Sequence, residues 1–193
     1  MEPVVVVSAA RSAIGRFGGA LRDLPPEKLA AAVMREAMQR ARVQPAELGD
    51  VILGCVLQSS DAPNVARVAS FWADIPVEVP AYTVHRQCGS GLQAVICGVQ
   101  AIMCGEARVV LAGGVESMSR APYYTNEARW GARSGHVSLY DPFVRNAESC
   151  SPAELFGYVN MGMTAENLAE RYGISREAQD AFALESHRKA VVA

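Results

Sequence analysis

The first 117 residues alternate between short apolar runs and longer segments of helical character. Four apolar runs have the length of a β-strand, and they lie at 3–9, 50–57, 81–87 and 108–117. The run at 3–9 (PVVVVSA) is a continuous β-branched stretch, which predicts a strand buried on both faces of a sheet.

The segments between these runs predict helices at 27–42, 63–75 and 91–105. In 27–42, apolar side chains recur every three to four residues and form one stripe. The segment 91–105 (GLQAVICGVQAIMCG) differs, because Gln93 and Gln100 are its only clearly polar side chains and they share one face. Such a helix is normally buried on most sides, so we expect more structure to cover it than one small sheet provides.

This alternation predicts an α/β fold, a layered sheet of parallel strands joined by right-handed crossovers. From about residue 118 the pattern changes. The next twenty residues are rich in Gly, Ser, Arg and aromatic residues without a sustained period, which indicates an ordered loop.

Two further helices are predicted near the end of the chain. The first spans 164–173, with Thr164 as its N-cap and Gly173 as its stop. The second spans 175–190 and has Ser175 as its N-cap.

Composition and charge narrow the function classes. Half of the 193 residues are hydrophobic, 20% are charged and the net charge is −2, so the chain is globular and gives no electrostatic reason to expect nucleic acid as a partner. No stretch reaches the roughly 18 apolar residues that span a bilayer, and the N-terminal run lacks the basic leader of a signal peptide, so no membrane is expected. The five cysteines lack CxxC spacing, which argues against a disulfide framework and a zinc or other metal site, and predicts a cytoplasmic location.

The stretch VHRQCGSGLQ places Cys88 between a predicted strand and a predicted helix. The small residues Gly89, Ser90 and Gly91 after it let the backbone turn sharply. The first amide groups of a helix have no partner inside it, and the helix dipole favours a negative charge there. The main-chain N–H of Cys88 and its neighbours can therefore bind an oxyanion, and Cys88 can act as a nucleophile. The alternative, an inert buried cysteine, stays open at this point.

The other cysteines are expected to have no chemical role. Cys97 and Cys104 lie seven apart inside the apolar helix and Cys55 lies inside a strand, so all three are predicted to be buried and inert. Cys150 lies in a polar loop and is assigned no role.

No base for Cys88 can be identified in this sequence. His85 lies three residues before it, an odd offset that sends the two side chains to opposite faces of a strand. His136 lies in the predicted loop and His187 in the last helix. An activated cysteine without a base is an incomplete site.

Motifs along the whole chain resemble those of the thiolases. In order they are VVVVSAARSAIGRFGGAL, DVILGCVLQ, VHRQCGSGLQAV, VVLAGGVESMSRAPY, RWG and MGMTAENLAERYGISREAQDAFALESHRKA. Thiolases make or cleave the carbon–carbon bond of 3-ketoacyl-CoA by Claisen chemistry. The resemblance implies that Cys88 forms an acyl thioester with acetyl-CoA, releases CoA and passes the acyl group to a second acetyl-CoA, or to CoA in the reverse direction. It implies no tightly bound cofactor, since coenzyme A and acetyl-CoA are substrates.

The resemblance covers the N-terminal half of the family. Thiolases have two similar halves in an α-β-α-β-α sandwich, with a CoA-binding loop domain inserted in the first half. By resemblance, residues 1–117 form one core half and 118–193 form part of the loop domain. The activating histidine, a second cysteine and an oxyanion asparagine belong to GHP, CxG and NEAF-type motifs of the other half, and none of these motifs occurs in this sequence.

Two interpretations follow. In the first, a second chain carries the C-terminal half, and such pairs form dimers or tetramers. In the second, the sequence is a piece of an ordinary thiolase. We also keep two alternatives for the function: a non-catalytic thiolase-like subunit that binds acyl-CoA or supports assembly, and a ketoacyl synthase, which shares the fold.

The resemblance assigns two residues to the acyl pocket. Met161 matches a methionine that lines this pocket, although an ordinary core methionine is the alternative. Asn160 stands where biosynthetic thiolases often carry histidine, which leaves the preferred acyl length open.

Overall fold

The computed structural model describes residues 3–192. The chain divides into two compact units, Met1–Pro122 and Tyr123–Ala193. The prediction that the second part is a partial CoA-binding loop domain stays a prediction.

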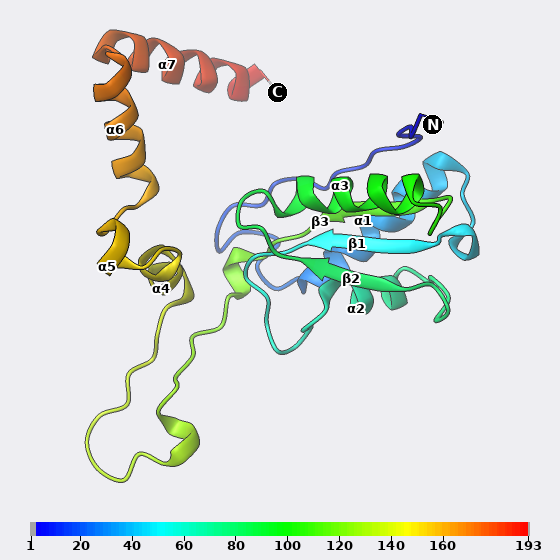
Figure 1. Cartoon of the computed structure of the whole chain (residues 1–193), viewed down its shortest axis with the longest axis horizontal. Coiled ribbons are helices and arrows are strands. Elements are labelled where there is room, and N and C mark those ends of the chain that lie inside the picture. Colours follow the sequence, from blue (N-terminus) through cyan, green and yellow to red (C-terminus); the bar gives the residue numbers. More distant parts are fainter. Residues whose placement is uncertain (1–2, 193) are drawn as a thin grey trace. The chain divides into compact units, whose positions relative to one another are not determined.

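The centre of the first unit is a parallel sheet (Figure 1). Its strands are β1 (Asp50–Gly54), β2 (Ala81–Val84) and β3 (Val110–Gly114), in the order β2-β1-β3. The predicted parallel α/β sheet is therefore confirmed, with strands shorter than expected at their ends. Crossover helices connect these strands, as parallel pairing requires.

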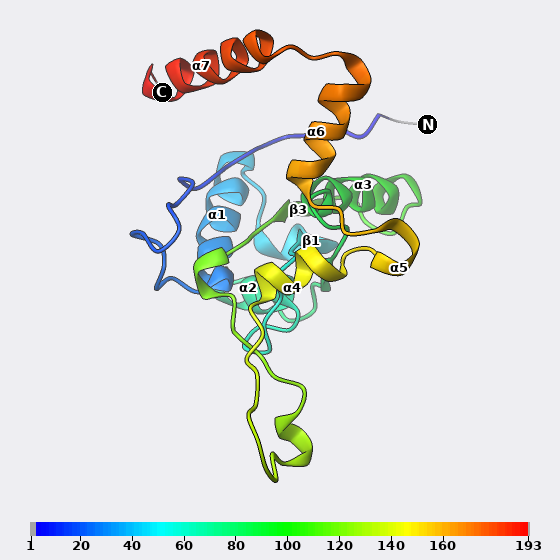
Figure 2. The same ribbon diagram turned by 90° about the vertical axis from the view of Figure 1, so that its left-hand side faces the viewer.

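Helices cover both faces of this sheet. They are α1 (Pro26–Ala41), α2 (Val65–Trp72) and α3 (Ser90–Met103), with short 3-10 turns η1 (Pro45–Glu47) and η2 (Met118–Arg120) between elements. The helix α3 lies on one face, and α1 and α2 lie on the other (Figures 1 and 2).

The main core of this unit lies between the sheet and the pair α1 and α2. Val51 and Leu53 are buried in one apolar cluster with Met34 and Ala66 from these helices. Alternate residues of a strand point to opposite faces. The side chain of Ile52, which is fully buried, therefore faces α3.

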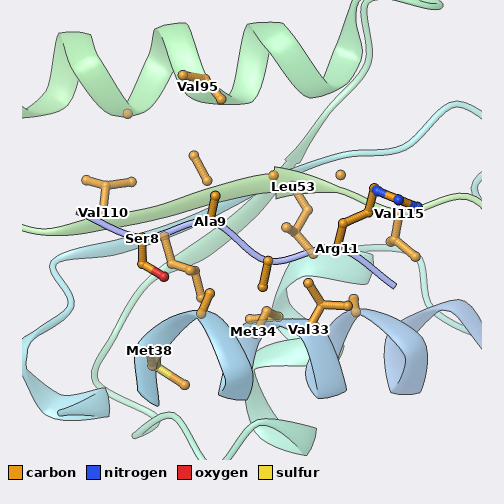
Figure 3. Close-up of a pocket in the computed structure, with 18 of the residues that line it drawn as sticks. Ser8, Ala9, Arg11, Val33, Met34, Met38, Leu53, Val95, Val110 and Val115 are labelled. Atoms are coloured by element: carbon orange, nitrogen blue, oxygen red, sulfur yellow. The ribbon is translucent and has the colours of Figure 1, made fainter. Parts of the chain in front are cut away.

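The predicted strand at 3–9 does not join the sheet. Val5, Val6 and Val7 are 68, 81 and 67% exposed, and a cavity of about 1440 Å³ lies among this run, α1, α3 and β3 (Figure 3). The guanidinium of Arg40 in α1 donates a hydrogen bond to the carbonyl oxygen of Ala9 (3.2 Å). β-branched residues favour an extended backbone, but a strand also needs a paired edge about 4.8 Å away. Here the cavity separates the run from the edge of β3.

The helix α3 is less covered than its sequence predicts. Leu92 is 67% exposed and Met103 is 49% exposed. The prediction that Cys104 is buried is wrong, because it is exposed at the C-terminal end of α3. The sheet covers one side of this helix, and its other apolar side has no cover among the described residues of this unit.

The second unit is helical. It contains η3 (Ala128–Trp130), α4 (Pro142–Ser149), α5 (Ala153–Phe156), α6 (Met161–Tyr172) and α7 (Arg176–Val192). The two predicted helices correspond to α6 and α7, whereas α4 and α5 were not predicted. None of the helices in residues 3–192 is both long enough and apolar enough to cross a membrane.

The caps of α6 and α7 test two of the predictions. The cap of α6 is Asn160, whose side chain accepts a hydrogen bond from the N–H of Met163 (2.9 Å), so the prediction of Thr164 is wrong. Thr164 lies inside the helix and donates its hydroxyl to the carbonyl oxygen of Asn160. The predicted cap of α7 is confirmed, because the hydroxyl of Ser175 accepts from the N–H of Ala178 (3.2 Å).

Candidate active site

Cys88 lies on the tight turn that joins β2 to α3. The strand ends at Val84 and the helix begins at Ser90, so five residues make the connection. The thiol is exposed, which excludes the inert buried alternative for this residue. Gln87, the residue before it, has a φ of +48°, a left-handed conformation that residues with a side chain rarely adopt.

Main-chain hydrogen bonds close this turn. The N–H of Gly89 donates to the carbonyl oxygen of Arg86 (3.1 Å), and the N–H of Ser90 donates to that of Gln87 (3.0 Å). The side chain of Ser90 is only 4% exposed. Its hydroxyl accepts from the N–H of Arg86 (2.8 Å) and donates to the carbonyl oxygen of Gln87 (2.6 Å).

These bonds decide which amides are available to a ligand. Gly89 and Ser90 use their N–H groups inside the turn, so neither can bind an oxyanion. The N–H of Cys88 has no acceptor among the described residues, and neither do those of Gly91 and Leu92 at the first turn of α3. The start of α3 therefore offers unpaired donors beside an exposed thiol.

Two glycines bring the head of α3 against the ends of the strands. A Cβ atom on Gly54, the last residue of β1, would lie 2.4 Å from the carbonyl carbon of Ser90. On Gly114, the last residue of β3, it would lie 3.5 Å from the Cα of Gly91. The Cys88 turn thus lies at the carboxyl ends of the parallel strands, where open α/β sheets bind their ligands.

A carboxylate holds the backbone that follows β1. Glu116 accepts hydrogen bonds from the N–H groups of Val56 (2.9 Å) and Leu57 (3.0 Å) and from the thiol of Cys55 (3.5 Å). These bonds draw residues 56 and 57 away from the sheet, which explains why β1 ends before the predicted position. Burial, together with the negative charge of Glu116, raises the pKa of the Cys55 thiol to about 12. Cys55 is buried and protonated at neutral pH, as predicted for an inert cysteine.

The remaining thiols take no part in this turn. Cys97 is half-buried in α3, where the side-chain amide of Gln93 donates to its sulfur (3.2 Å). Cys150 is exposed in the second unit.

The histidine of the first unit does not act on Cys88 in this structure. His85 is exposed, and its Nδ1 accepts from the N–H of Gln87 at 3.4 Å. No hydrogen bond joins it to Cys88 among residues 3–192. Over the same residues, no group of three or more His, Cys, Asp or Glu side chains is placed to hold a metal ion.

The two predicted pocket residues lie in the second unit. Asn160 uses its side-chain oxygen to cap α6, and Met161, the first residue of this helix, is 70% exposed. Their place in an acyl pocket beside Cys88 stays a prediction.

The sequence indicated Ser90 only as a small residue of the turn and gave no sign of its hydrogen bonds, and it gave no role to Glu116. A buried serine between two glycines and a carboxylate directly after an apolar run are weak signals, because both residue types are common on surfaces. Their hydrogen-bond partners become visible only in the fold.

The protein-family model described as "Thiolase, N-terminal domain" matches residues 4–193 of this chain. The chain belongs to the thiolase family. It is 46% identical over 193 residues to an acetyl-CoA acetyltransferase of Pseudomonas aeruginosa, covering 100% of this chain and 48% of that protein. It is 47% identical over 191 residues to the β-ketothiolase BktB of Cupriavidus necator, covering 98% and 47%.

A solved structure agrees with these matches. The crystal structure of the Bacillus anthracis acetyl-CoA acetyltransferase superimposes with a TM-score of 0.88 at 44% identity, over 97% of this chain and 46% of that one. The chain therefore spans about half the length of the relatives it matches. The resemblance to the N-terminal half of a thiolase is confirmed, and so is the fold class.

Proposed function

We propose that this chain is the nucleophile-bearing half of an acetyl-CoA C-acetyltransferase. In the first step the Cys88 thiol loses its proton and its sulfur attacks the carbonyl carbon of acetyl-CoA. The bond from this carbon to the CoA sulfur breaks, CoA takes up the proton and leaves as the free thiol, and an acetyl thioester remains on Cys88. In the second step the α-carbon of another acetyl-CoA loses a proton and attacks this thioester, which releases acetoacetyl-CoA and the free thiol. Thiolysis of acetoacetyl-CoA by CoA follows the same two steps in the reverse order.

The exposed Cys88 at the head of α3 is the observation that carries this proposal. A tetrahedral intermediate places a negative charge on the former carbonyl oxygen, and unpaired amides at a helix start stabilise such a charge. The N–H of Cys88 is the donor closest in sequence to the reacting sulfur, and it has no acceptor within the described residues. We assign the oxyanion site to this group.

We further propose that a second chain carries the C-terminal half. Three features of the first unit support a missing half: the uncovered apolar side of α3, the thiol without a base, and the cavity of about 1440 Å³ beside β3 (Figure 3). The lining of this cavity includes Val33 and Met34 of α1 and Val110 of β3, so an added segment would bury apolar surface on both sides. The partner would supply the histidine and the second cysteine, and pairs would associate into dimers or tetramers.

The substrate assignment follows the relatives that are named acetyl-CoA acetyltransferases. In this proposal Met161 and Asn160 line the acyl pocket, and Asn160 in place of histidine alters which acyl groups fit. Coenzyme A enters as a substrate and no tightly bound cofactor is required. The five free cysteines fit a reducing, cytoplasmic location.

Thiolysis of acetoacetyl-CoA tests the proposal. The chain alone should show almost no turnover, because no base lies beside Cys88 among residues 3–192. Addition of the C-terminal half of the Pseudomonas aeruginosa relative, expressed as a separate polypeptide, should restore activity to wild-type Cys88 and not to Cys88→Ser. Robust turnover by the chain alone would contradict the need for a second half. An acyl-CoA-binding subunit without catalysis would bind acetoacetyl-CoA in the mixture and leave it intact.

A further inference from the structure

The turn that carries Cys88 holds one residue in a backbone conformation that costs free energy. Gln87 has a φ of +48°. Among the described residues, the non-glycine residues with a left-handed backbone are Arg42, Asp74 and Gln87. Arg42 is a helix C-cap, where this conformation is common. Gln87 lies directly before the nucleophile, in a turn that must be held by other contacts.

Ser90 makes the short hydrogen bonds to Gln87, whose own N–H donates to Nδ1 of His85 at 3.4 Å. The Ser90 hydroxyl donates to the carbonyl oxygen of Gln87 (2.6 Å) and accepts from the N–H of Arg86 (2.8 Å), while the N–H of Ser90 donates to the same Gln87 carbonyl (3.0 Å). The hydroxyl therefore links the peptide group that precedes Arg86 to the one that follows Gln87, and so spans the strained residue. Because Ser90 is 4% exposed, water has little access to replace these bonds.

We propose that Ser90 is a positioning residue for the nucleophile. Its hydroxyl keeps Gln87 left-handed, and this conformation presents the Cys88 thiol beside the unpaired amides at the head of α3. Ser90 touches neither substrate nor reacting atoms in this role. The inference rests on the proposed function of Cys88 as nucleophile, but its test uses only the reactivity of the thiol.

The test measures alkylation of the native chain by iodoacetamide. One tryptic peptide, residues 87–108, contains Cys88, Cys97 and Cys104, and fragment ions resolve the label on each. Cys104 lies exposed at the opposite end of α3. The rate at which Cys104 is alkylated is therefore an internal reference for access of the reagent. This assay requires neither acetyl-CoA nor a second half, so it can succeed or fail independently of the proposed function.

Ser90→Ala should lower the alkylation rate of Cys88 about fivefold or more and leave that of Cys104 unchanged. The factor corresponds to the usual cost of a left-handed backbone for a residue with a side chain. The matched control is Ser70→Ala. Ser70 is buried as well, and its hydroxyl donates to the carbonyl oxygen of Arg67 (2.8 Å) in α2, away from the turn. It should lower the urea midpoint to a similar extent without changing the Cys88 rate.

A second substitution separates positioning from general stability. Glycine adopts a positive φ at little cost. In Gln87→Gly the hydrogen bonds of the Ser90 hydroxyl are therefore no longer needed to keep this residue left-handed. In that background Ser90→Ala should change the Cys88 rate less than twofold. An unchanged or faster Cys88 rate in Ser90→Ala, an equal loss in Ser70→Ala, or an undiminished loss in the glycine background would each overturn the proposal. If Ser90→Ala does not fold, the glycine background decides: failure to fold there as well makes Ser90 a folding residue and also overturns it.

Discussion

Replacing Gly54 by alanine adds one methyl group at the point where β1 meets the head of α3. The added carbon would lie 2.4 Å from the carbonyl carbon of Ser90, 2.6 Å from its oxygen and 2.6 Å from the nitrogen of Gly91. All three are backbone atoms, which cannot rotate away as a flexible side chain can. Ordinary contact begins near 3.4 Å, so the first turn of α3 must move by about 1 Å.

The magnitude follows from two opposing effects. Overpacking of this kind costs about 1–3 kcal/mol, and rigid backbone places Gly54→Ala at the upper end. Loss of a glycine from a strand returns about 0.5–1 kcal/mol. We therefore expect the free energy of unfolding to fall by about 2 kcal/mol. The Cys88 turn leads directly into α3 and should move with this helix.

Urea unfolding measures this change. In a Trp130→Phe background, the fluorescence of Trp72 in α2 reports on the first unit alone. The matched control is Gly91→Ala, where a Cβ atom meets nothing within 4 Å, so this helix position should gain about 0.5–1 kcal/mol. Equal stability of Gly54→Ala and wild type, or a similar loss in both variants, would refute the close packing of α3 on β1.

Three further predictions concern the support of the sheet. Asn64→Ala removes the cap of α2 and the amide that donates to the carbonyl oxygen of Ala81, so urea titration should show the free energy of unfolding to fall by about 2 kcal/mol. Asn64→Asp keeps the cap and should lower the free energy of unfolding by about half as much. Burial raises the pKa of the Cys55 thiol from 9.0 to about 12, so the folded chain keeps this proton at a pH where the unfolded chain loses it. The free energy of unfolding should therefore fall as pH rises above about 9, by about 2 kcal/mol at pH 10.5. Cys55→Ala should remove this part of the slope, and an identical pH dependence in both proteins would contradict it. Glu116→Gln should lower the free energy of unfolding by about 1.5 kcal/mol, because two amides lose a charged acceptor, and an unchanged urea midpoint would speak against that role.

The strands and helices of the first unit could be predicted because their signals are local. A period of 3.6 residues in 27–42 and the apolar runs near 50 and 110 indicate their structure without knowledge of their neighbours. The run at 3–9 shows the limit of this reasoning. Its four valines favour an extended backbone, but pairing also depends on an adjacent strand edge. The sequence does not show that a cavity separates this run from the edge of β3.

The site was predictable in part for a similar reason. Cys88 could be singled out because two glycines and a predicted helix start follow it directly in the sequence. The left-handed conformation of Gln87 could not, since glutamine rarely adopts it and nothing local requires it. The helix α4 had a readable signal that was missed: Asp141 caps the N–H of Phe143 (2.8 Å), and Pro142 follows at the first helical position.

Mass spectrometry can show whether Cys88 accepts the acyl group. The chain, mixed with the C-terminal half of the Pseudomonas aeruginosa relative, is incubated with acetyl-CoA, quenched in acid and digested. We predict one acetyl group, held as a thioester on Cys88, absent in Cys88→Ser and released by added CoA. No acetylation, or acetylation on another cysteine while Cys88 stays free, would show that Cys88 is not the acyl acceptor.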